Sequence, residues 1–344
     1  MEAPHVSRYG SHHTGAAGTQ SENRPPLCDE AHPGAQRPEK GEVRPVRTVC
    51  VIVNYNDADT TIAQIERIRE YKSLDAVIVV DNASTDASAL RLRSMVRDKV
   101  IFVTAEKNGG YGAGNNLGIR YASEVLRAER ALIANPDAEF TDACVAALTE
   151  TMERHPELAA LAPVQQNPSL PAEAGIPGSR QNVLSGAAAW PLRPWLYDLL
   201  ESGPLMRRIF AHILHYPRWR YIGRELVHVD CVPGSLLMVD IDKFRQSGGY
   251  DEEIFLYEEE YVLGWKLRFH GFRTGLLMTE HYLHRHAVSI RRSYQRLLER
   301  QRLREAATLQ YYRRYLEVSG AQLLVTRLFH AVVKLEARLL GRFL

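Results

Sequence analysis

The sequence predicts an α/β protein with a doubly wound, mostly parallel sheet flanked by helices, and three observations lead to this prediction. Short apolar, β-branched runs alternate with segments of helical periodicity in the first half of the chain. The runs are apolar at successive positions, as in strands that are buried on both faces. Polar residues directly follow three of the runs. Since ligands bind beyond the carboxyl ends of such strands, this third observation predicts where a site lies.

The predicted elements follow one another in chain order. Residues 46–53 form a first strand, and the helix expected over 57–71 has Ile62, Ile65 and Ile68 on one side. The next elements are a strand at 76–80, a helix at 87–96, a strand at 100–103, a helix at 116–127 and a strand at 131–134. Later elements are a strand at 274–278 and two helical patterns at 291–318 and 321–343.

Composition divides the chain into three parts. The first 46 residues are rich in Gly, Pro, Ser and His and have no hydrophobic period, which is typical of disorder. Residues 281–344 contain 13 Lys and Arg against 4 Asp and Glu, although the whole chain has a net charge of only +2. We therefore expect a disordered segment 1–46, a globular domain 47–289 and a basic helical C-terminal extension 290–344.

Cysteine usage and hydropathy bear on the compartment. The four cysteines form no C-x-x-C pair and have no zinc-ligand spacing, so we interpret them as free thiols in a reducing compartment. No apolar run approaches the ~18 residues that span a bilayer. The N-terminus also lacks the apolar core of a secretory signal. These observations predict a cytoplasmic protein and leave contact with the inner face of the membrane open.

Asp81 and Asp137 stand directly beyond predicted strands. At the end of the strand at 76–80, a carboxylate can accept hydrogen bonds from a base or a ribose; the alternative for Asp81 is a turn or capping residue. Asp137 follows Asn135 and Pro136, and the proline turn would aim it at the same crevice. Because a magnesium or manganese diphosphate needs only one or two protein carboxylates, Asp137 is a predicted metal ligand, with a plain turn former as its alternative.

The segment NGGYGAGNN, residues 108–116, contains four glycines and leads into a predicted helix. Glycine allows positive φ and a close approach of the backbone to a ligand, and the N–H groups at a helix start favour phosphate. A plain tight loop is the alternative. No Lys-Ser/Thr follows, which excludes a G-x-x-x-x-G-K-[ST] phosphate loop.

An acidic cluster between Gly249 and Glu260 has six carboxylates in ten residues. Aromatic and aliphatic side chains interrupt it, and acids held against such groups can have the raised pKa that a general base near neutral pH needs. An exposed acidic turn is the alternative. Further on, the spacing of His281, His284 and His286 fits no zinc site. We therefore expect a single histidine to help hold a metal-diphosphate.

Seven segments together resemble glycosyltransferase family 2, and within it the rhamnosyltransferase-like branch with the GT-A fold. They occur in the family's order and cover residues 48–289, roughly 70% of the chain. The segments are VIVNYN (51–56), VVDNASTD (79–86), NGGYGAGNN (108–116), NPDA (135–138), VPGSLLMV (232–239), GGYDEEIFLYEEE (248–260) and HRHAVS (284–289).

The resemblance implies roles for individual residues. Base and ribose would lie against Asn54, Tyr55, Asn56 and Asp81, and the nucleotide-sugar against Gly110, Gly114, Asn115 and Asn135. The metal ligands would be Asp137 and His284, the catalytic base Glu260 paired with Glu259, and the acceptor side Asp251 and Tyr257. One position departs from the family's pattern. An acid commonly stands two residues after the catalytic pair, where this chain has Val262, so acceptor recognition is expected to be unusual.

The expected activity is metal-dependent, inverting transfer of a hexose or deoxyhexose such as rhamnose. The donor would be a UDP- or dTDP-linked sugar, the acceptor a glycan or lipid-linked saccharide, and the cofactor Mg²⁺ or Mn²⁺. A sugar nucleotidylyltransferase is one alternative, although it would favour a glycine-rich basic loop where this chain has residues 54–57. A non-catalytic nucleotide- or glycan-binding scaffold is another. No nucleic-acid partner is expected.

The last predicted helix, at 321–343, is amphipathic. Its apolar face contains Leu324, Leu328, Val332, Leu335, Leu339 and Phe343, and its narrower basic stripe Arg327, Lys334, Arg338 and Arg342. This layout is typical of a helix that lies in a membrane interface. Packing on the domain, or a homodimer contact, is the alternative.

Overall fold

The computed structural model describes residues 47–166, 189–202, 206, 209–210, 213–284 and 297–340. All of these residues belong to one compact unit of the chain. The predictions for segment 1–46, for His286 and for the domain boundary at 289 lie outside the described residues.

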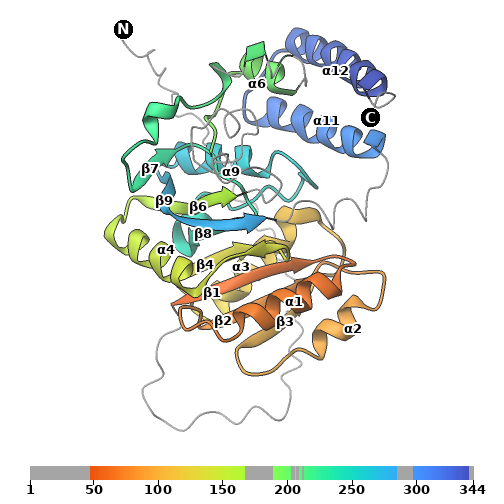
Figure 1. Ribbon diagram of the computed structural model, residues 1–344. Helices are drawn as coiled ribbons and strands as arrows, with labels where there is room; N and C mark the ends of the chain where they lie inside the picture. The colour runs from red at the N-terminus through yellow and green to blue at the C-terminus, as the bar shows by residue number, and fades with distance from the viewer. Residues whose placement is uncertain are drawn as a thin grey trace, which may run out of the picture. The chain divides into compact units, whose positions relative to one another are not determined.

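One sheet runs through the described part of the chain (Figure 1). Its strands are β1 (Thr48–Asn54), β2 (Ala76–Asp81), β3 (Val100–Thr104), β4 (Arg130–Ala134), β5 (Ala138–Glu139), β6 (Leu158–Gln166), β7 (Leu226–Val229), β8 (Leu236–Asp240) and β9 (Arg273–His284). Their order is β3-β2-β1-β4-β8-β6-β9-β5, and β7 pairs with β9. Strands β1 to β4 are parallel, and β8 is antiparallel to both β4 and β6. Since β9 is parallel to β6, while β5 and β7 oppose β9, six of these nine described strands point the same way, as predicted.

Helices cover both faces of the sheet, which confirms the doubly wound prediction. The described helices are α1 (Ala58–Ile68), α2 (Ser88–Arg93), α3 (Gly110–Glu124), α4 (Asp142–Arg154), α6 (Trp195–Ser202), α8 (Ile241–Gln246), α9 (Glu259–Phe269), α11 (Leu297–Arg314) and α12 (Gly320–Leu340). Neighbouring residues of β1 belong to different cores. Val51 packs in the core that contains Ile119 of α3, and Ile52 in the core that contains Ile65 of α1. Residues 49–53 of β1 are therefore all apolar, because each face of the strand has its own helical layer.

Helix α3 begins at Gly110, six residues before the predicted helix, so part of the glycine-rich segment is helical. A Cβ on Gly118 would come within 2.4 Å of the Val51 side chain, and one on Gly114 within 2.7 Å of the Val53 side chain. These two glycines lie four residues apart on one helix face, where they let α3 approach β1 closely. Glycine content that suggested a loop thus serves helix-to-sheet packing.

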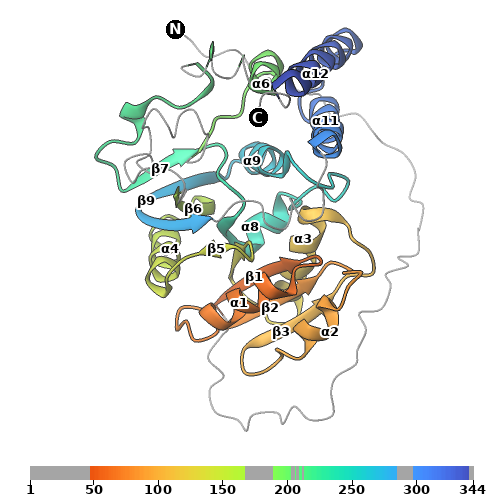
Figure 2. The same cartoon turned by 45° about the vertical axis from the view of Figure 1, so that its right-hand side comes forward.

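The C-terminal helices pack on the domain, and α12 lies beside α6 and α11 in both views (Figure 1 and Figure 2). The indole N–H of Trp195 in α6 donates to the Thr326 hydroxyl at 2.9 Å. Lys334 forms an ion pair with Glu305 of α11 at 2.9 Å. Thr326 and His330 are buried on this side of α12. The packing alternative is therefore correct for one face of α12, while the opposite face is exposed.

Candidate active site

The ends of β1 and β2 meet in a buried hydrogen-bonded group. Asn54 and Asp81 are register partners, and the Asn54 amide donates to the Asp81 carboxylate at 2.9 Å. The backbone N–H and the hydroxyl of Ser84 donate to the same carboxylate at 3.0 and 2.6 Å. The structure thus brings the predicted pair together. Asp81 also stabilises the turn after β2, which was the alternative to its binding role.

Asn56 connects the end of β1 to that same turn. Its backbone has a positive φ of 53°. Its side-chain oxygen accepts the Thr85 N–H at 2.8 Å, and its own N–H donates to the Ser84 hydroxyl at 3.0 Å. Tyr55 lies half-buried between Asn54 and Asn56 at this edge of the sheet. The contact of these three residues with a base stays a prediction.

The glycine-rich segment lies against the acidic segment. Gly110 has a φ of 88°, and a Cβ there would come within 2.0 Å of the Phe255 carbonyl oxygen. The Tyr111 N–H donates to that carbonyl at 3.2 Å, and the buried Asn82 amide donates to the Gly110 carbonyl at 2.9 Å. The Asn115 amide donates to the Tyr111 carbonyl at 3.0 Å. These bonds fix the segment between β2 and the acidic cluster, and its contact with a nucleotide-sugar stays a prediction.

Asp137 and His284, the two predicted metal ligands, meet although 147 positions separate them. An Asp137 oxygen lies 3.1 Å from His284 Nε2, and the side chains are 10 and 12% exposed. They meet because Ala138 of β5 is the register partner of His284 at the end of β9. Among the described residues no group of three or more His, Cys, Asp or Glu could hold a metal ion. One carboxylate with one imidazole fits a cation whose other ligands are phosphate oxygens and water.

Gly234 and Ser235 join three predicted parts of the site. The Asn135 N–H donates to the Ser235 carbonyl at 2.9 Å. Gly234 accepts the Tyr111 hydroxyl at 2.6 Å on its carbonyl and donates its N–H to a Glu260 oxygen at 3.3 Å. The segment therefore lies between the NPDA turn, the start of α3 and the start of α9. The resemblance includes the segment VPGSLLMV but assigns no role to Gly234 or Ser235. The Pro-Gly dipeptide was the only local signal at these positions.

Burial raises the pKa of each acid at the start of α9. For Glu260 burial is the main cause, and backbone N–H groups, that of Gly234 among them, lower the pKa in part. Burial and then the Glu260 charge hold the pKa of Glu259 well above its ordinary value. Burial and then the Asp198 charge raise the pKa of Glu258 to about 8. A carboxylate with a raised pKa can accept a proton near neutral pH, so this cluster has the electrostatics of a general base.

The predicted acceptor-side residues Asp251 and Tyr257 lie under α11. The Tyr315 hydroxyl donates to Asp251 at 2.7 Å, and the Arg304 guanidinium lies 4.8 Å from the centre of the Tyr257 ring. Val262 is fully buried in the same apolar cluster as residues of α11. A carboxylate at this position would be buried against apolar side chains at a cost in free energy, which is a physical reason for valine here. Contact of Asp251 and Tyr257 with an acceptor stays a prediction.

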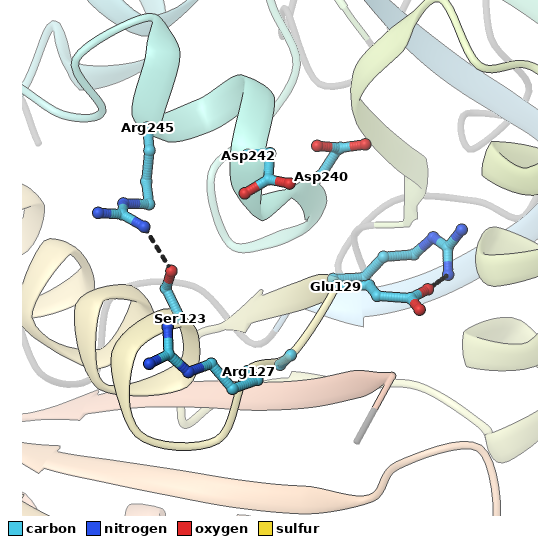
Figure 3. Close-up of a pocket in the computed structure, with 8 residues that line it drawn as sticks. Ser123, Arg127, Glu129, Asp240, Asp242 and Arg245 are labelled. Atoms are coloured by element: carbon cyan, nitrogen blue, oxygen red, sulfur yellow. Dashed lines mark hydrogen bonds and ion pairs between the residues drawn. The ribbon is translucent and has the colours of Figure 1, made fainter. Parts of the chain in front are cut away.

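A hollow of about 400 Å³ lies at the opposite end of the parallel strands, near the start of β4 (Figure 3). Arg130 and Asp240, which line it, are register partners at the start of β4 and the end of β8. Arg245 donates to the Ser123 hydroxyl across it at 2.7 Å. Both acidic and basic side chains line the hollow, and none of the predicted site residues does. It lies away from the carboxyl ends of the parallel strands.

Comparison with known proteins agrees with this geometry. Residues 49–175 match the sequence profile described as Glycosyl transferase family 2. The chain is 26% identical over 255 residues to the low-salt glycan biosynthesis hexosyltransferase Agl10 of Haloferax volcanii, covering 72% of this chain and 71% of that protein. It is 25% identical over 226 residues to the N-acetylglucosaminyl-diphospho-decaprenol L-rhamnosyltransferase of Mycobacterium tuberculosis, covering 62% of this chain and 67% of that enzyme.

Two solved structures share the fold. The mannosyltransferase PcManGT from Pyrobaculum calidifontis, in complex with GDP-Man and Mn²⁺, has a TM-score of 0.53 at 14% identity, with 86% of this chain and 76% of that chain covered. GalNAc-T7 with UDP, GalNAc and Mn²⁺ has a TM-score of 0.52 at 15% identity. The comparison covers 71% of this chain and 44% of GalNAc-T7, so this chain spans less than half of that protein.

The fold is of the GT-A type, and the family match and the two curated relatives define the chain as a glycosyltransferase. Residues 49–175 contain a glycosyltransferase family 2 domain, and the relatives are consistent with the rhamnosyltransferase-like branch. The predictions of fold, family and enzyme class are confirmed.

Proposed function

We propose that this chain transfers a hexose or deoxyhexose, with inversion, from a nucleoside-diphosphate sugar to a hydroxyl of a glycan or lipid-linked saccharide. One observation carries the proposal. The NPDA turn, which contains Asp137, and the half-buried Glu260 carboxylate are both bonded to the Gly234–Ser235 segment, and Asp137 lies 3.1 Å from His284. This arrangement offers an anion-holding side and a proton-accepting side within one site.

On the donor side, Asp137 and His284 would hold a divalent cation together with the diphosphate. The cation, when bound, offsets the charge that develops on the leaving group. Asn54, Tyr55, Asn56 and Asp81 would receive the nucleoside, and the start of α3 the sugar and phosphates. Both structural neighbours contain Mn²⁺, which supports a divalent cofactor.

On the acceptor side, Glu260 would take the proton of the attacking hydroxyl. As the new bond from this oxygen to the anomeric carbon forms, the bond to the diphosphate breaks and inverts that carbon. The raised pKa of Glu260 supports this role. Glu259 is less suited because it is only 6% exposed, whereas Glu260 is half-buried and within reach of an acceptor. The nucleotidylyltransferase alternative loses support, since the residues after β1 form amide contacts to Ser84 and Thr85 in place of a basic phosphate loop.

We also propose that α12 contacts an anionic membrane surface. Leu324, Leu328, Val332 and Leu335 recur along its outer side and are 56 to 62% exposed, with the exposed cation of Arg327 beside them. Apolar residues flanked by cations match a lipid interface. The decaprenol-linked acceptor in the name of the mycobacterial relative gives such contact a purpose. No helix among the described residues is long and apolar enough to cross a bilayer.

The test is a transfer assay with a panel of UDP-, dTDP- and GDP-linked hexoses, with and without Mn²⁺. Candidate acceptors are a soluble glycan and an N-acetylglucosaminyl-diphospho-polyprenol. We expect one donor to give a product of inverted anomeric configuration, and chelation to stop its formation. Retention of configuration, or release of pyrophosphate with formation of a nucleotide-sugar, would contradict the proposal.

A further inference from the structure

Helix α9, which begins with the two candidate bases, starts from an unusual turn. Tyr257 and Glu258 both have a positive φ, of 74° and 65°, in the left-handed region that residues with a Cβ rarely adopt. Glu258 is the N-cap of α9, yet its side chain makes no capping hydrogen bond. Two consecutive left-handed residues without a local cap need contacts from elsewhere in the fold to persist.

Those contacts come from one face of α11. Arg304 lies over the Tyr257 ring, and the Thr308 hydroxyl donates to a Glu258 carboxyl oxygen at 2.8 Å. Tyr311 packs beside α9, and the Tyr315 hydroxyl, one residue beyond the end of α11, donates to Asp251. These four contact residues recur at intervals of four, three and four along the chain, which places them on one helix face. Figure 1 and Figure 2 show α11 next to α9.

The Thr308–Glu258 bond is the contact nearest to the candidate base. Glu258 directly precedes Glu259 and Glu260, and only Glu260 reaches Gly234, through a bond of 3.3 Å between its oxygen and the Gly234 N–H. A small rotation of the first turn of α9 would break this contact. Such displacements of a catalytic group lower turnover more than they weaken substrate binding.

We propose that Thr308 is a positioning residue for glycosyl transfer. Its hydroxyl fixes the left-handed turn at Glu258 and so holds the Glu260 carboxylate beside Gly234. The proposal rests on the proposed role of Glu260 as the base. It makes the C-terminal extension a structural part of the active site, in addition to any contact with a membrane.

The experiment compares three variants of the full chain with the wild type. Thr308→Val keeps the shape of the side chain and removes the hydroxyl, whereas Thr308→Ser keeps the hydroxyl. Thr326→Val is the matched control, because Thr326 is also a buried threonine, and its hydroxyl bonds to Trp195 of α6 and to the Gln322 carbonyl, not to the turn at Glu258. We expect Thr308→Val to lower kcat by about 10- to 100-fold with the KM for the donor unchanged. Thr308→Ser and Thr326→Val should keep the wild-type kcat.

Hydrogen exchange of residues 257–262, followed by mass spectrometry, gives a second readout. Faster exchange is expected in Thr308→Val alone. A wild-type kcat in Thr308→Val, or an equal loss in Thr326→Val, would overturn the proposal while leaving the transferase function intact. If the wild type transfers no sugar from any donor, the proposed function fails. Exchange then decides the role of Thr308, and unchanged exchange in Thr308→Val overturns it.

Discussion

At the residue scale, Asp137 and Glu260 differ in their surroundings and therefore in the chemistry that suits them. Asp137 lies beside an imidazole nitrogen at 3.1 Å, at the end of a strand pair. Glu260 is half-buried and follows two other acids in the chain, and the loss of hydration raises its pKa. A carboxylate beside a second ligand suits a cation, whereas a carboxylate with a raised pKa suits proton transfer.

Substitution of Asp137 tests the cation side. Asp137→Asn keeps the shape and removes the charge, so donor binding in the presence of Mn²⁺ should weaken by about 100-fold or more. Calorimetric titration of the donor with and without Mn²⁺ measures this. Glu139→Gln, which removes a carboxylate two residues away that pairs with Arg67, is the control and should bind normally. Equal affinity of Asp137→Asn and wild type would remove Asp137 from the site.

Substitution of Glu260 tests the proton-transfer side. Glu260→Gln should lower kcat by ~10²–10⁴, with donor affinity nearly unchanged, because only the transition state needs the base. Single-turnover kinetics with calorimetry separates the two quantities. Glu259→Gln is the neighbouring control. If it loses turnover while Glu260→Gln stays active, the base is Glu259, and if neither matters the acidic cluster is structural.

At the scale of elements, the glycines of α3 have a packing role that a substitution can measure. A Cβ on Gly118 would come within 2.4 Å of Val51, so Gly118→Ala should lower the free energy of unfolding by about 1–3 kcal/mol through overpacking. Gly320 at the start of α12 has nothing within 4 Å of such a Cβ. Gly320→Ala should therefore be neutral or stabilising, by up to about 1 kcal/mol. Urea unfolding compares both variants with the wild type, and equal effects would contradict this account.

The two faces of helix α12 lie in different surroundings. On one side of α12, Thr326 and His330 are buried against the domain, and on the other Leu328 and Val332 are exposed. Helical periodicity in the sequence revealed the exposed apolar face, because it depends only on residue spacing. Which face packs on the domain depends on the positions of α6 and α11, which only tertiary contacts define.

At the scale of the whole molecule, the buried acids predict that stability falls as pH rises. Burial raises the pKa of Glu258 to about 8. Between its ordinary pKa of 4.5 and this value, the folded chain keeps a proton that the unfolded chain releases. The stabilising protonation is complete below pH 4.5 and is lost as pH rises towards 8.

Urea unfolding at pH 5, 6.5 and 8 tests this dependence. We expect the wild type to lose about 1–3 kcal/mol of unfolding free energy across the range. Glu258→Gln should flatten the dependence because it removes the titrating group. Glu106→Gln, at an exposed acid elsewhere, should keep the wild-type slope. If the unfolding free energy of Glu258→Gln depends on pH as steeply as that of the wild type, other titrating groups cause the dependence.

The outer face of α12 predicts membrane binding of the intact protein. Replacing Leu328 and Val332 together with glutamine removes two exposed apolar side chains without opening the core. Co-sedimentation with phosphatidylglycerol vesicles should then weaken by about tenfold or more, and wild-type binding should decrease as salt rises. Leu90→Gln, at a 76% exposed leucine of α2, is the control. If the wild type does not co-sediment with these vesicles at low salt, α12 serves only to pack on the domain.

The sequence by itself determined the alternation of strands and helices, the polar strand ends and the family. Apolar period and turn residues are local, so β1, β2, β3 and β4 could be placed within a few residues. Asp81 and Asp137 could be predicted because each directly follows its strand. The resemblance supplied His284 and Glu260, whose roles no local pattern could define.

Only the tertiary structure decided which distant residues meet. Asp137 and His284 are neighbours because β5 pairs with β9, and Gly234 reaches both Tyr111 and Glu260 because a loop lies between α3 and α9. The glycines of α3 resembled a loop until the proximity of β1 explained them. The apolar residue at position 262 is explained only by its packing against α11. Periodicity reports the surroundings of a single element, whereas these contacts depend on chain paths separated by many residues, which no local spacing encodes.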